Sequence, residues 1–242
     1  MRIVSWNIHR RIQQPWDYLV NHLDADVALL QECGRLPKSV DDSKVIHRLA
    51  KGRKFGNAIY VKGGEIVEYT VESVQEGSLV ISVVETPKEQ QLVLINIYGL
   101  LESLPENPRK KLVVPGIHRS LSDISYLFQG HTRPKHTNFV VAGDFNTDRR
   151  MDDHPTFKRK GKRTVNLMFD RIENYLLQDC MKEFYPNYIQ TYRHTTRSFL
   201  WQLDHMFASK KVFSNLKNLY VDDSEEVKSI SDHSPIVADF DI

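Results

Sequence analysis

The apolar residues of this chain follow two spacings, one typical of strands and one typical of helices. Short apolar runs predict buried strands at residues 3–8, 26–32 and 138–143. Between the first two runs, apolar residues recur at helical spacing after Pro15, and they predict a helix over residues 15–23. A strand, a helix and a second strand at the start of the chain are typical of an α/β unit.

The middle of the chain has a different pattern, which predicts hairpins. Successive strands are expected at residues 56–61, 65–71, 79–85 and 91–97. A Gly-Gly pair at 63–64 and a Pro-Lys-Glu stretch at 87–89 supply turns. Hairpins join antiparallel strands, so this section predicts antiparallel pairing. Residues 33–55 are expected to be irregular, and residues 99–114 are expected to form a loop.

The C-terminal half returns to alternating helices and strands. Helices are expected at residues 117–128 and 165–177. The remaining strands are expected near residues 202–207, 216–221 and 236–240. No linker, internal repeat or low-complexity stretch interrupts the sequence, so a single domain over residues 1–242 is expected. The combination of α/β units and hairpins predicts mixed β-sheets.

Composition narrows the class of protein without identifying a partner. The 33 basic and 31 acidic residues exclude a histone-like polycation and an acidic tail protein. Two cysteines, Cys33 and Cys180, with no C-x-x-C pair favour a reducing, cytoplasmic setting over a disulfide framework. The N-terminus predicts a strand rather than a signal peptide, and no apolar run approaches the ~20 residues that span a bilayer. No membrane association is expected, and a monomer is the default.

The strand predicted at residues 138–143 leads into Gly143-Asp144-Phe145-Asn146. In an extended segment, Asp144 and Asn146 would lie on the same side. The carboxylate can accept a proton or orient a water, and the amide can donate hydrogen bonds to a phosphoryl oxygen. The same residues suit an Asx turn at the end of a strand. Taken alone, the motif favours this structural role somewhat more than chemistry.

Other predicted strand ends carry polar side chains that a buried strand does not need. They are Asn7, Gln31, Glu32, Asn96, Tyr98, Asp204, His205 and the stretch Ser231-Asp232-His233-Ser234. Each alone suits an ordinary cap, turn or surface position, but together their chemistries complement one another. Glu32 and Asp232 are oxygen ligands suited to Mg²⁺. Asp204 is suited to orient His233 and raise its pKa, so that an imidazolium faces a phosphate.

Six stretches occur in an order that resembles the endonuclease/exonuclease/phosphatase superfamily, which includes exonuclease III-like and DNase I-like enzymes. They are Ser5-Trp6-Asn7-Ile8, Leu29-Leu30-Gln31-Glu32, Asn96-Ile97-Tyr98, Gly143-Asp144-Phe145-Asn146, Leu203-Asp204-His205-Met206-Phe207 and Ser231-Asp232-His233-Ser234-Pro235-Ile236. Each motif is weak alone, but six in the right order are specific. The resemblance spans residues 3–238. It implies an α/β (α+β) fold, a four-layer sandwich of two packed mixed β-sheets flanked by helices, with the site at one rim.

The resemblance also implies a metal site. Glu32 would be the principal Mg²⁺ ligand, with Mn²⁺ as the alternative ion, and Asn7 and Asp232 would be ligands directly or through water. One departure lies here. The abasic endonucleases place an aspartate two residues after the first-strand asparagine, where this chain has His9. That difference weakens an assignment to the abasic endonucleases, and His9 would either reach the metal or phosphate or be a surface residue.

The remaining matched residues would carry the chemistry. The resemblance implies that Asp144 aligns or deprotonates the attacking water and that Asn146 holds the scissile phosphate. His233, partnered by Asp204, would stabilise the developing charge. Tyr98 would contact the phosphate.

These expectations indicate metal-dependent hydrolysis of a phosphodiester, favouring a nuclease that acts on DNA or RNA. Basic clusters near the motifs would follow a nucleic-acid backbone. They are Arg10-Arg11, Arg109-Lys110-Lys111, Arg149-Arg150 and residues 158–163. The alternatives are a phosphatase of small phosphorylated molecules or lipid headgroups, with the clusters as solvated charge, or a non-catalytic binding module. Arg193, Arg197 and Trp201 would line a groove or have core or surface roles, and His205 is expected to point away from the site.

Overall fold

A computed structural model describes most of the chain. The described residues are 1–73, 75–100, 102–104, 107–112, 114–128, 138–154, 164–195 and 199–242. The basic stretch at residues 158–163 and the proposed groove residue Arg197 lie outside these ranges.

The larger strands form two six-stranded mixed sheets. The first sheet runs in the order β15 (Leu216–Val221), β16 (Ile236–Phe240), β1 (Arg2–Asn7), β2 (Val27–Cys33), β4 (Gly56–Val61) and β3 (Val45–Leu49). The second runs in the order β11 (Leu177–Asp179), β14 (Asp204–Ser209), β10 (Phe139–Asp144), β7 (Gln91–Ile97), β6 (Leu79–Glu85) and β5 (Ile66–Glu68). Each sheet has one parallel pair, β1 with β2 and β7 with β10, and its other neighbours are antiparallel.

Helices and two small hairpins complete the described elements. The α-helices are α1 (Gln14–Asn21), α2 (Val114–Asp123), α3 (Thr164–Asn174), α4 (Cys180–Phe184), α5 (Lys210–Phe213) and α6 (Glu225–Ile230). Single 3₁₀ turns lie at Asp42–Lys44, Ser125–Phe128 and Arg149–Asp152. The hairpins pair β8 (Glu102–Leu104) with β9 (Asn107–Leu112), and β12 (Tyr192–Arg193) with β13 (Leu200–Trp201). In the part of the chain that the structure describes, no helix has the length and apolar character needed to cross a membrane.

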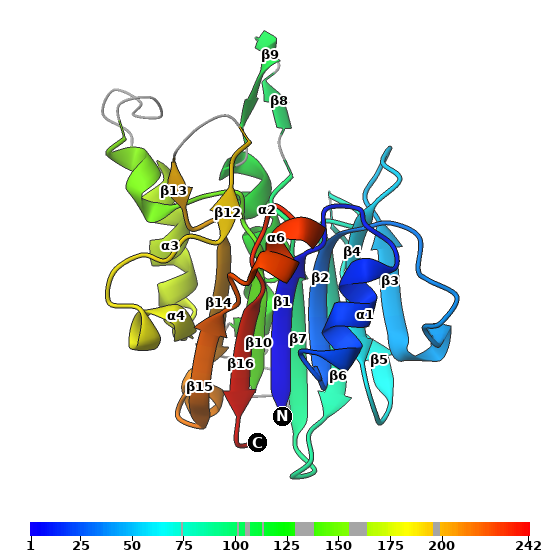
Figure 1. The fold of residues 1–242 in the computed structure, drawn as a ribbon. Helices are drawn as coiled ribbons and strands as arrows, with labels where there is room; N and C mark the ends of the chain where they lie inside the picture. The colour runs from blue at the N-terminus through cyan, green and yellow to red at the C-terminus, as the bar shows by residue number, and fades with distance from the viewer. Residues whose placement is uncertain are drawn as a thin grey trace.

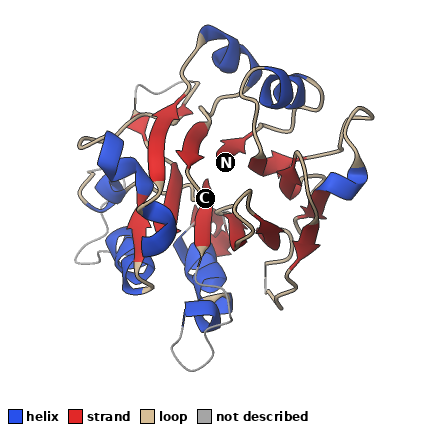
Figure 2. Cartoon of the chain, turned by 90° about the horizontal axis from the view of Figure 1, so that it is seen from below, coloured by secondary structure: helices blue, strands red, loops and turns tan. Residues whose placement is uncertain are grey.

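The buried apolar residues divide into layers that match this arrangement. The inner faces of the sheets meet in one cluster, which contains Ile3 and Leu29 from the first sheet and Leu94 and Val140 from the second. The outer face of the second sheet packs against α2 and α3. The outer face of the first packs against α1 and α6. Figures 1 and 2 show the helices outside two facing sheets. The predicted four-layer sandwich is therefore confirmed.

The topology brings the predicted polar strand ends to one rim. The parallel pairs end at the same edge of their sheets, and the antiparallel partners β14 and β16 begin there. In Figure 1 this rim lies at the top, where the β8–β9 hairpin also projects, and both chain termini lie at the bottom. Residues far apart in sequence can therefore share one site.

Some sequence-based predictions of local structure were wrong. Residues 33–55 are not wholly irregular, because β3 lies within them as an edge strand. Its sequence Val-Ile-His-Arg-Leu buries only Ile46 fully, so the apolar signal was weak. The predicted loop at 99–114 contains the β8–β9 hairpin, which projects beyond the two sheets in Figure 1. Its sequence lacks the regular alternation of apolar and polar residues that predicts a strand. The helix predicted to reach residue 177 ends at Asn174, before Leu176 adopts a φ of 61° and β11 begins.

Candidate active site

The end of β10 is held close to β7 by a glycine. Gly143 has a φ of 147°, and a Cβ atom at this position would lie 1.9 Å from the carbonyl oxygen of Ile97. Only glycine fits such a close approach between backbones without displacing one of them. Beyond it, the backbone N–H of Gly99 donates to the carbonyl oxygen of Asp144 at 2.7 Å. The glycine of the Gly-Asp-Phe-Asn motif thus fixes where Asp144 stands at the rim.

The carboxylate of Asp144 is buried and held by several donors. Its Oδ2 accepts from the side-chain amides of Asn7 at 2.9 Å and Asn146 at 3.1 Å. Its Oδ1 accepts from the backbone N–H of Asn146 at 2.8 Å, which forms an Asx turn. Asn146 has a φ of 49°, so the two side chains meet through a turn and not through an extended strand, as the sequence had suggested. The Asx turn and a place in the site are therefore compatible.

The side-chain amide of Asn146 already has hydrogen-bond partners within the protein, although its predicted role was to bind the phosphate. Its side-chain NH₂ donates to Asp144 Oδ2 and, at 3.1 Å, to the carbonyl oxygen of Gly99. These two bonds account for both amide protons. In this arrangement Asn146 orients Asp144, and its contact with a phosphate stays a prediction.

His233 and Asp204 form a buried pair beside Asp144. His233 Nδ1 lies 2.8 Å from Asp204 Oδ2, and His233 Nε2 lies 3.8 Å from Asp144 Oδ2. The backbone around His233 is fixed as well. Its carbonyl oxygen accepts from Trp6 Nε1 at 3.0 Å, and its N–H donates to the hydroxyl of Ser231 at 3.1 Å. The imidazole therefore has a defined direction, toward Asp144.

The electrostatics of this group favour a charged imidazole. Burial lowers the pKa of His233, but the charges of Asp204 and Asp144 outweigh it and raise the pKa. Burial also raises the pKa of Asp144, and Asp204 adds to this, although His233 and the hydrogen bond from Asn7 oppose it. A buried cation thus stands next to a carboxyl group that takes up a proton more readily than an ordinary aspartate.

Glu32 lies at the end of β2 and is bound from two sides. The hydroxyl of Tyr98, which is 6% exposed, donates to Glu32 Oε1 at 2.7 Å. Arg10 Nε lies 3.0 Å from Glu32 Oε2. Burial and the charges of Glu32 and Asp144 raise the pKa of Tyr98, so this phenol stays protonated and donates. In this structure Tyr98 therefore orients Glu32, and its predicted contact with the phosphate is not tested.

The acidic residues at this rim suit a hard divalent cation. Among the residues that the structure describes, Glu32 Oε2 and Asp232 Oδ1 are buried and accept no hydrogen bond. Each instead faces a basic side chain, since His9 Nδ1 lies 3.0 Å from Asp232 Oδ1 just as Arg10 faces Glu32. Buried carboxylate oxygens without hydrogen bonds require compensating positive charge. Carboxylate oxygens of this kind are the ligands that hard divalent cations prefer.

A second group of side chains could also hold a metal ion. Asp144, Asp204 and His233 each place one ligand atom within 4.8 Å of the others. A metal there would compete with the hydrogen bond between Asp204 and His233. The raised pKa of His233 favours an imidazolium, which has no lone pair for a metal. These three residues are thus better suited to moving and holding protons.

Comparison with known proteins agrees with this geometry. The model of the Endonuclease/Exonuclease/phosphatase family matches residues 4–233. The chain belongs to this family. No curated protein sequence matches it significantly. The predicted family resemblance is therefore confirmed, and it supports a phosphoesterase with nuclease-type activity.

Solved structures show the same fold. An AP endonuclease from Archaeoglobus fulgidus has a TM-score of 0.72 and 19% identity, over 100% of both chains. The catalytic domain of Xenopus laevis APE2 has a TM-score of 0.73 and 18% identity, over 99% of this chain and 91% of that one. The Neisseria 3′ phosphatase NExo, solved with product DNA, has a TM-score of 0.70 and 19% identity, over 100% of both chains.

Two polar residues singled out in the sequence serve the core of this family member instead of its site. Gln31 and Asn96 are fully buried between the sheets. Gln31 Nε2 donates to Asn96 Oδ1 at 2.8 Å, and Asn96 Nδ2 donates to carbonyl oxygens of Leu30 and Ala58. They bind the two sheets together directly beneath the site.

Several basic and aromatic groove candidates also have structural partners. Arg149 pairs with Glu173 at 2.7 Å and lies 4.2 Å from the ring of Phe169. Arg150 pairs with the buried Asp148, which caps the following 3₁₀ turn. The guanidinium of Arg193 donates to the carbonyl oxygen of Ser231 at 2.7 Å. These three arginines are therefore poor candidates for phosphate contacts.

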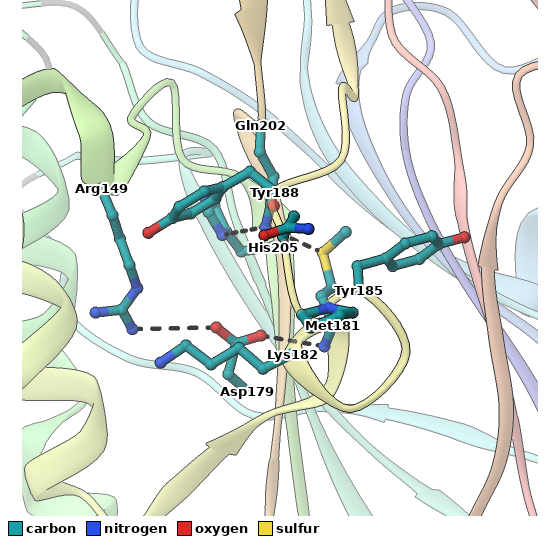
Figure 3. Close-up of a pocket in the computed structure, with 10 residues that line it drawn as sticks. Arg149, Asp179, Met181, Lys182, Tyr185, Tyr188, Gln202 and His205 are labelled. Atoms are coloured by element: carbon teal, nitrogen blue, oxygen red, sulfur yellow. Dashed lines mark hydrogen bonds and ion pairs between the residues drawn. The ribbon is translucent and has the colours of Figure 1, made fainter.

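Trp201, which was predicted to line a groove or to have a core or surface role, is 6% exposed and lies in an aromatic cluster with His154 and Phe199. His205 was expected to point away from the site, and this is confirmed. It lines a cavity of about 220 Å³ on the other side of β14, together with Arg149 and Gln202 (Figure 3).

The sequence did not reveal Tyr192 as a site residue. Its ring lies 4.8 Å from the ring of His233. Burial raises its pKa, and the negative charges of Asp232, Asp144 and Glu32 raise it further, so this phenol stays protonated beside the acidic residues. Tyr192 belongs to a strand of two residues, which leaves no periodic signal. Only its contact with His233 identifies it.

Proposed function

We propose that this protein is a divalent-metal-dependent phosphodiesterase that acts on nucleic acid. The observation that carries the proposal is the convergence of Asp144 with the Asp204–His233 pair at the rim that also holds Glu32 and Asp232. A carboxylate that can accept a proton from water and a buried imidazolium that can donate a hydrogen bond to developing negative charge are both suited to the hydrolysis of a phosphodiester.

The side chains divide the work as follows. Asp144 orients the attacking water and takes its proton as the oxygen bonds to phosphorus. The phosphorus–oxygen bond to the leaving group breaks, and the leaving oxygen keeps the bonding electron pair and takes a proton from solvent. Asn7 and Asn146 fix the direction of Asp144. His233, held by Asp204 through Nδ1, donates a hydrogen bond from Nε2 to a phosphoryl oxygen as negative charge increases. Tyr192, whose ring lies 4.8 Å from that of His233, would form a wall of the site.

The metal would be held by Glu32 and Asp232, with Asn7 as a ligand or through a water. Bound Mg²⁺ or Mn²⁺ would supply charge neutralisation at the phosphate, which otherwise repels a nucleophile. Tyr98 contributes by holding Glu32 in one direction.

A polynucleotide is the proposed substrate class. Its support is the fold shared with nucleases and with a 3′ phosphatase solved with DNA. The β8–β9 hairpin adds support, because β9 carries Arg109, Lys110 and Lys111 and projects from the rim of the site (Figure 1). A phosphatase of small phosphorylated molecules is the second candidate, since the paired arginines leave fewer cations for a polymer. A monomer in a cytoplasmic setting remains a prediction.

A substrate panel tests the proposal. Labelled single- and double-stranded DNA and RNA are incubated with Mg²⁺ or Mn²⁺, alongside small phosphomonoesters. We expect cleavage of at least one polymer that EDTA abolishes. Release of phosphate from small esters, with every polymer intact, would move the protein to the phosphatase class.

The β9 cations provide a second test of the substrate class. Replacing Arg109, Lys110 and Lys111 with glutamine should lower polymer affinity and reduce the slope of log affinity against log salt by about 1–3, one for each phosphate that a removed cation had neutralised. Hydrolysis of a small phosphodiester should not change. The matched control is Arg150→Gln, which we expect to leave the slope unchanged because Arg150 is paired with Asp148.

A further inference from the structure

The turn after β1 carries two basic residues in an unusual backbone conformation. His9 and Arg10 have φ values of 48° and 60°, a left-handed region that side-chain-bearing residues seldom adopt. The turn is fixed by its backbone, since the N–H of Arg10 donates to the carbonyl oxygen of Glu32 at 3.1 Å and that of Arg11 donates to Ile8 at 3.0 Å. Arg10 is therefore held directly over the residue predicted to be the principal metal ligand.

The side chain of Arg10 continues this contact. Its Nε lies 3.0 Å from Glu32 Oε2, and its guanidinium carbon lies 5.3 Å from the centre of the Phe55 ring. The other oxygen of Glu32 is engaged by Tyr98. The side chain of Glu32 is only 16% exposed, whereas that of Arg10 is 52% exposed. The arginine thus covers the open side of a carboxylate whose other side is closed.

We propose that Arg10 is a tethered cation that a divalent metal must displace from Glu32, so that this arginine weakens metal binding. The inference rests on the proposed function, because it takes Glu32 as a metal ligand. Mg²⁺ binds a carboxylate oxygen at about 2.0–2.1 Å, which would bring it within a few ångströms of a guanidinium at Oε2. Two like charges at that separation repel one another strongly where water is partly excluded. Metal and guanidinium therefore exclude each other at this oxygen.

The test measures metal binding without catalysis. Mn²⁺ is titrated into the protein at low ionic strength, and free Mn²⁺ is counted by electron paramagnetic resonance. Arg10→Gln removes the charge at Glu32, and Arg11→Gln is the matched control, since it removes the same charge from the neighbouring exposed residue. We expect Arg10→Gln to bind Mn²⁺ about tenfold more tightly than the wild type, while Arg11→Gln changes affinity by about twofold or less.

Two further variants keep the result interpretable. Arg10→Lys keeps the charge and should bind Mn²⁺ nearly as weakly as the wild type. Arg10→Met removes the charge and replaces Arg10→Gln if that variant proves poorly folded by circular dichroism, with the same tighter binding expected. Glu32→Gln tests the site itself. A Glu32-dependent affinity that Arg10→Gln does not raise above that of Arg11→Gln would overturn this inference alone. Equal Mn²⁺ affinity in the wild type and in Glu32→Gln would overturn the proposed metal site and this inference with it.

Discussion

Two buried histidines lie on opposite faces of β14, and their pKa values are shifted in opposite directions. On the face of Asp204, His233 shares a hydrogen bond with a carboxylate, and its pKa is raised. On the face of His205, Nε2 lies 2.9 Å from the carbonyl oxygen of Thr147 and Nδ1 lies 3.3 Å from Gln202 Nε2. The carbonyl oxygen of Thr147 can only accept a hydrogen bond, and the side-chain NH₂ of Gln202 can only donate one. A ring with one N–H and one bare nitrogen, which is the neutral imidazole, matches this pair of partners. Burial lowers the pKa of His205.

The two pKa values are shifted in opposite directions because the hydrogen-bond partners of the two rings differ. Burial does not explain the difference, since both rings are almost fully buried. His205 packs against the rings of Phe145 and Phe169 beside the cavity in Figure 3. No carboxylate bonds to its ring in the part of the chain that the structure describes. A buried histidine becomes a cation for catalysis only where a carboxylate is built next to it.

The largest expected effect comes from removing each imidazole in turn. His233→Gln should lower kcat by about 10²–10³-fold, because the site loses the buried imidazolium proposed to stabilise negative charge on the phosphate. His205→Gln should keep kcat within a few-fold but lower stability by about 1–3 kcal/mol through poorer packing and an unpaired Thr147 carbonyl. Steady-state kinetics and thermal unfolding of both variants measure the two effects. A loss of activity in His205→Gln at temperatures where the variant is folded would contradict the assignment of a structural role to His205 and a catalytic role to His233.

The next effect is on the pH profile of cleavage. The pKa of Asp144 is raised to about 7, and that of His233 is raised to about 9. The proposed mechanism needs Asp144 deprotonated and His233 protonated, so kcat/KM should rise through the first value and fall through the second. Asp204→Asn removes the charge that raises the pKa of His233, so its alkaline limb should move to lower pH. An alkaline limb in the same place as that of the wild type would show that His233 is not the titrating acid.

A smaller effect concerns stability against pH. The folded-state pKa of His205 lies below its ordinary value of 6.5, so the unfolded chain binds the proton more tightly. Its contribution to stability is present above pH 6.5 and is lost as the pH falls, by about 1.4 kcal/mol for each pH unit until the folded-state pKa is reached. Urea unfolding of the wild type and His205→Gln from pH 7.5 to 5 isolates this contribution. Parallel curves would mean that His205 titrates normally in the folded protein.

The smallest expected effect on activity comes from changing the hydrogen-bond partner of His205. Gln202→Glu places a carboxylate where His205 now meets an amide. The pKa of His205 should rise by about 1–3 units, as expected for a histidine beside an opposite charge, while kcat stays unchanged. Imidazole resonances followed by nuclear magnetic resonance through a pH titration report the shift. A pKa that stays lowered would show that burial outweighs the partner at this position.

Much of the fold was predictable because its core strands are apolar runs at regular intervals. The strand that ends in Asp144 and the pairing of Asp204 with His233 followed from residue type and order. The close approach at Gly143 and the left-handed turn at Asn146 did not, because they depend on a neighbouring strand. Tyr192 was missed as a site residue for the same reason, and Arg10 was predicted only as part of a basic cluster and not as a partner of Glu32. Their partners, His233 and Glu32, are brought to them by the packing of the two sheets and by the turn after β1.

The proposal that Asp144 acts in a metal-dependent phosphodiesterase is tested most directly by metal-initiated cleavage of the preferred phosphodiester. The wild type is compared with Asp144→Asn. Each protein is stripped with EDTA, and the rate is recorded before and after excess Mn²⁺ is added. We expect no cleavage before addition, rapid cleavage by the wild type afterwards, and a rate at least about 10²-fold lower for the folded variant. Equal rates for the two proteins, or cleavage that continues in EDTA, would contradict the claim that Asp144 acts in a metal-dependent phosphodiesterase.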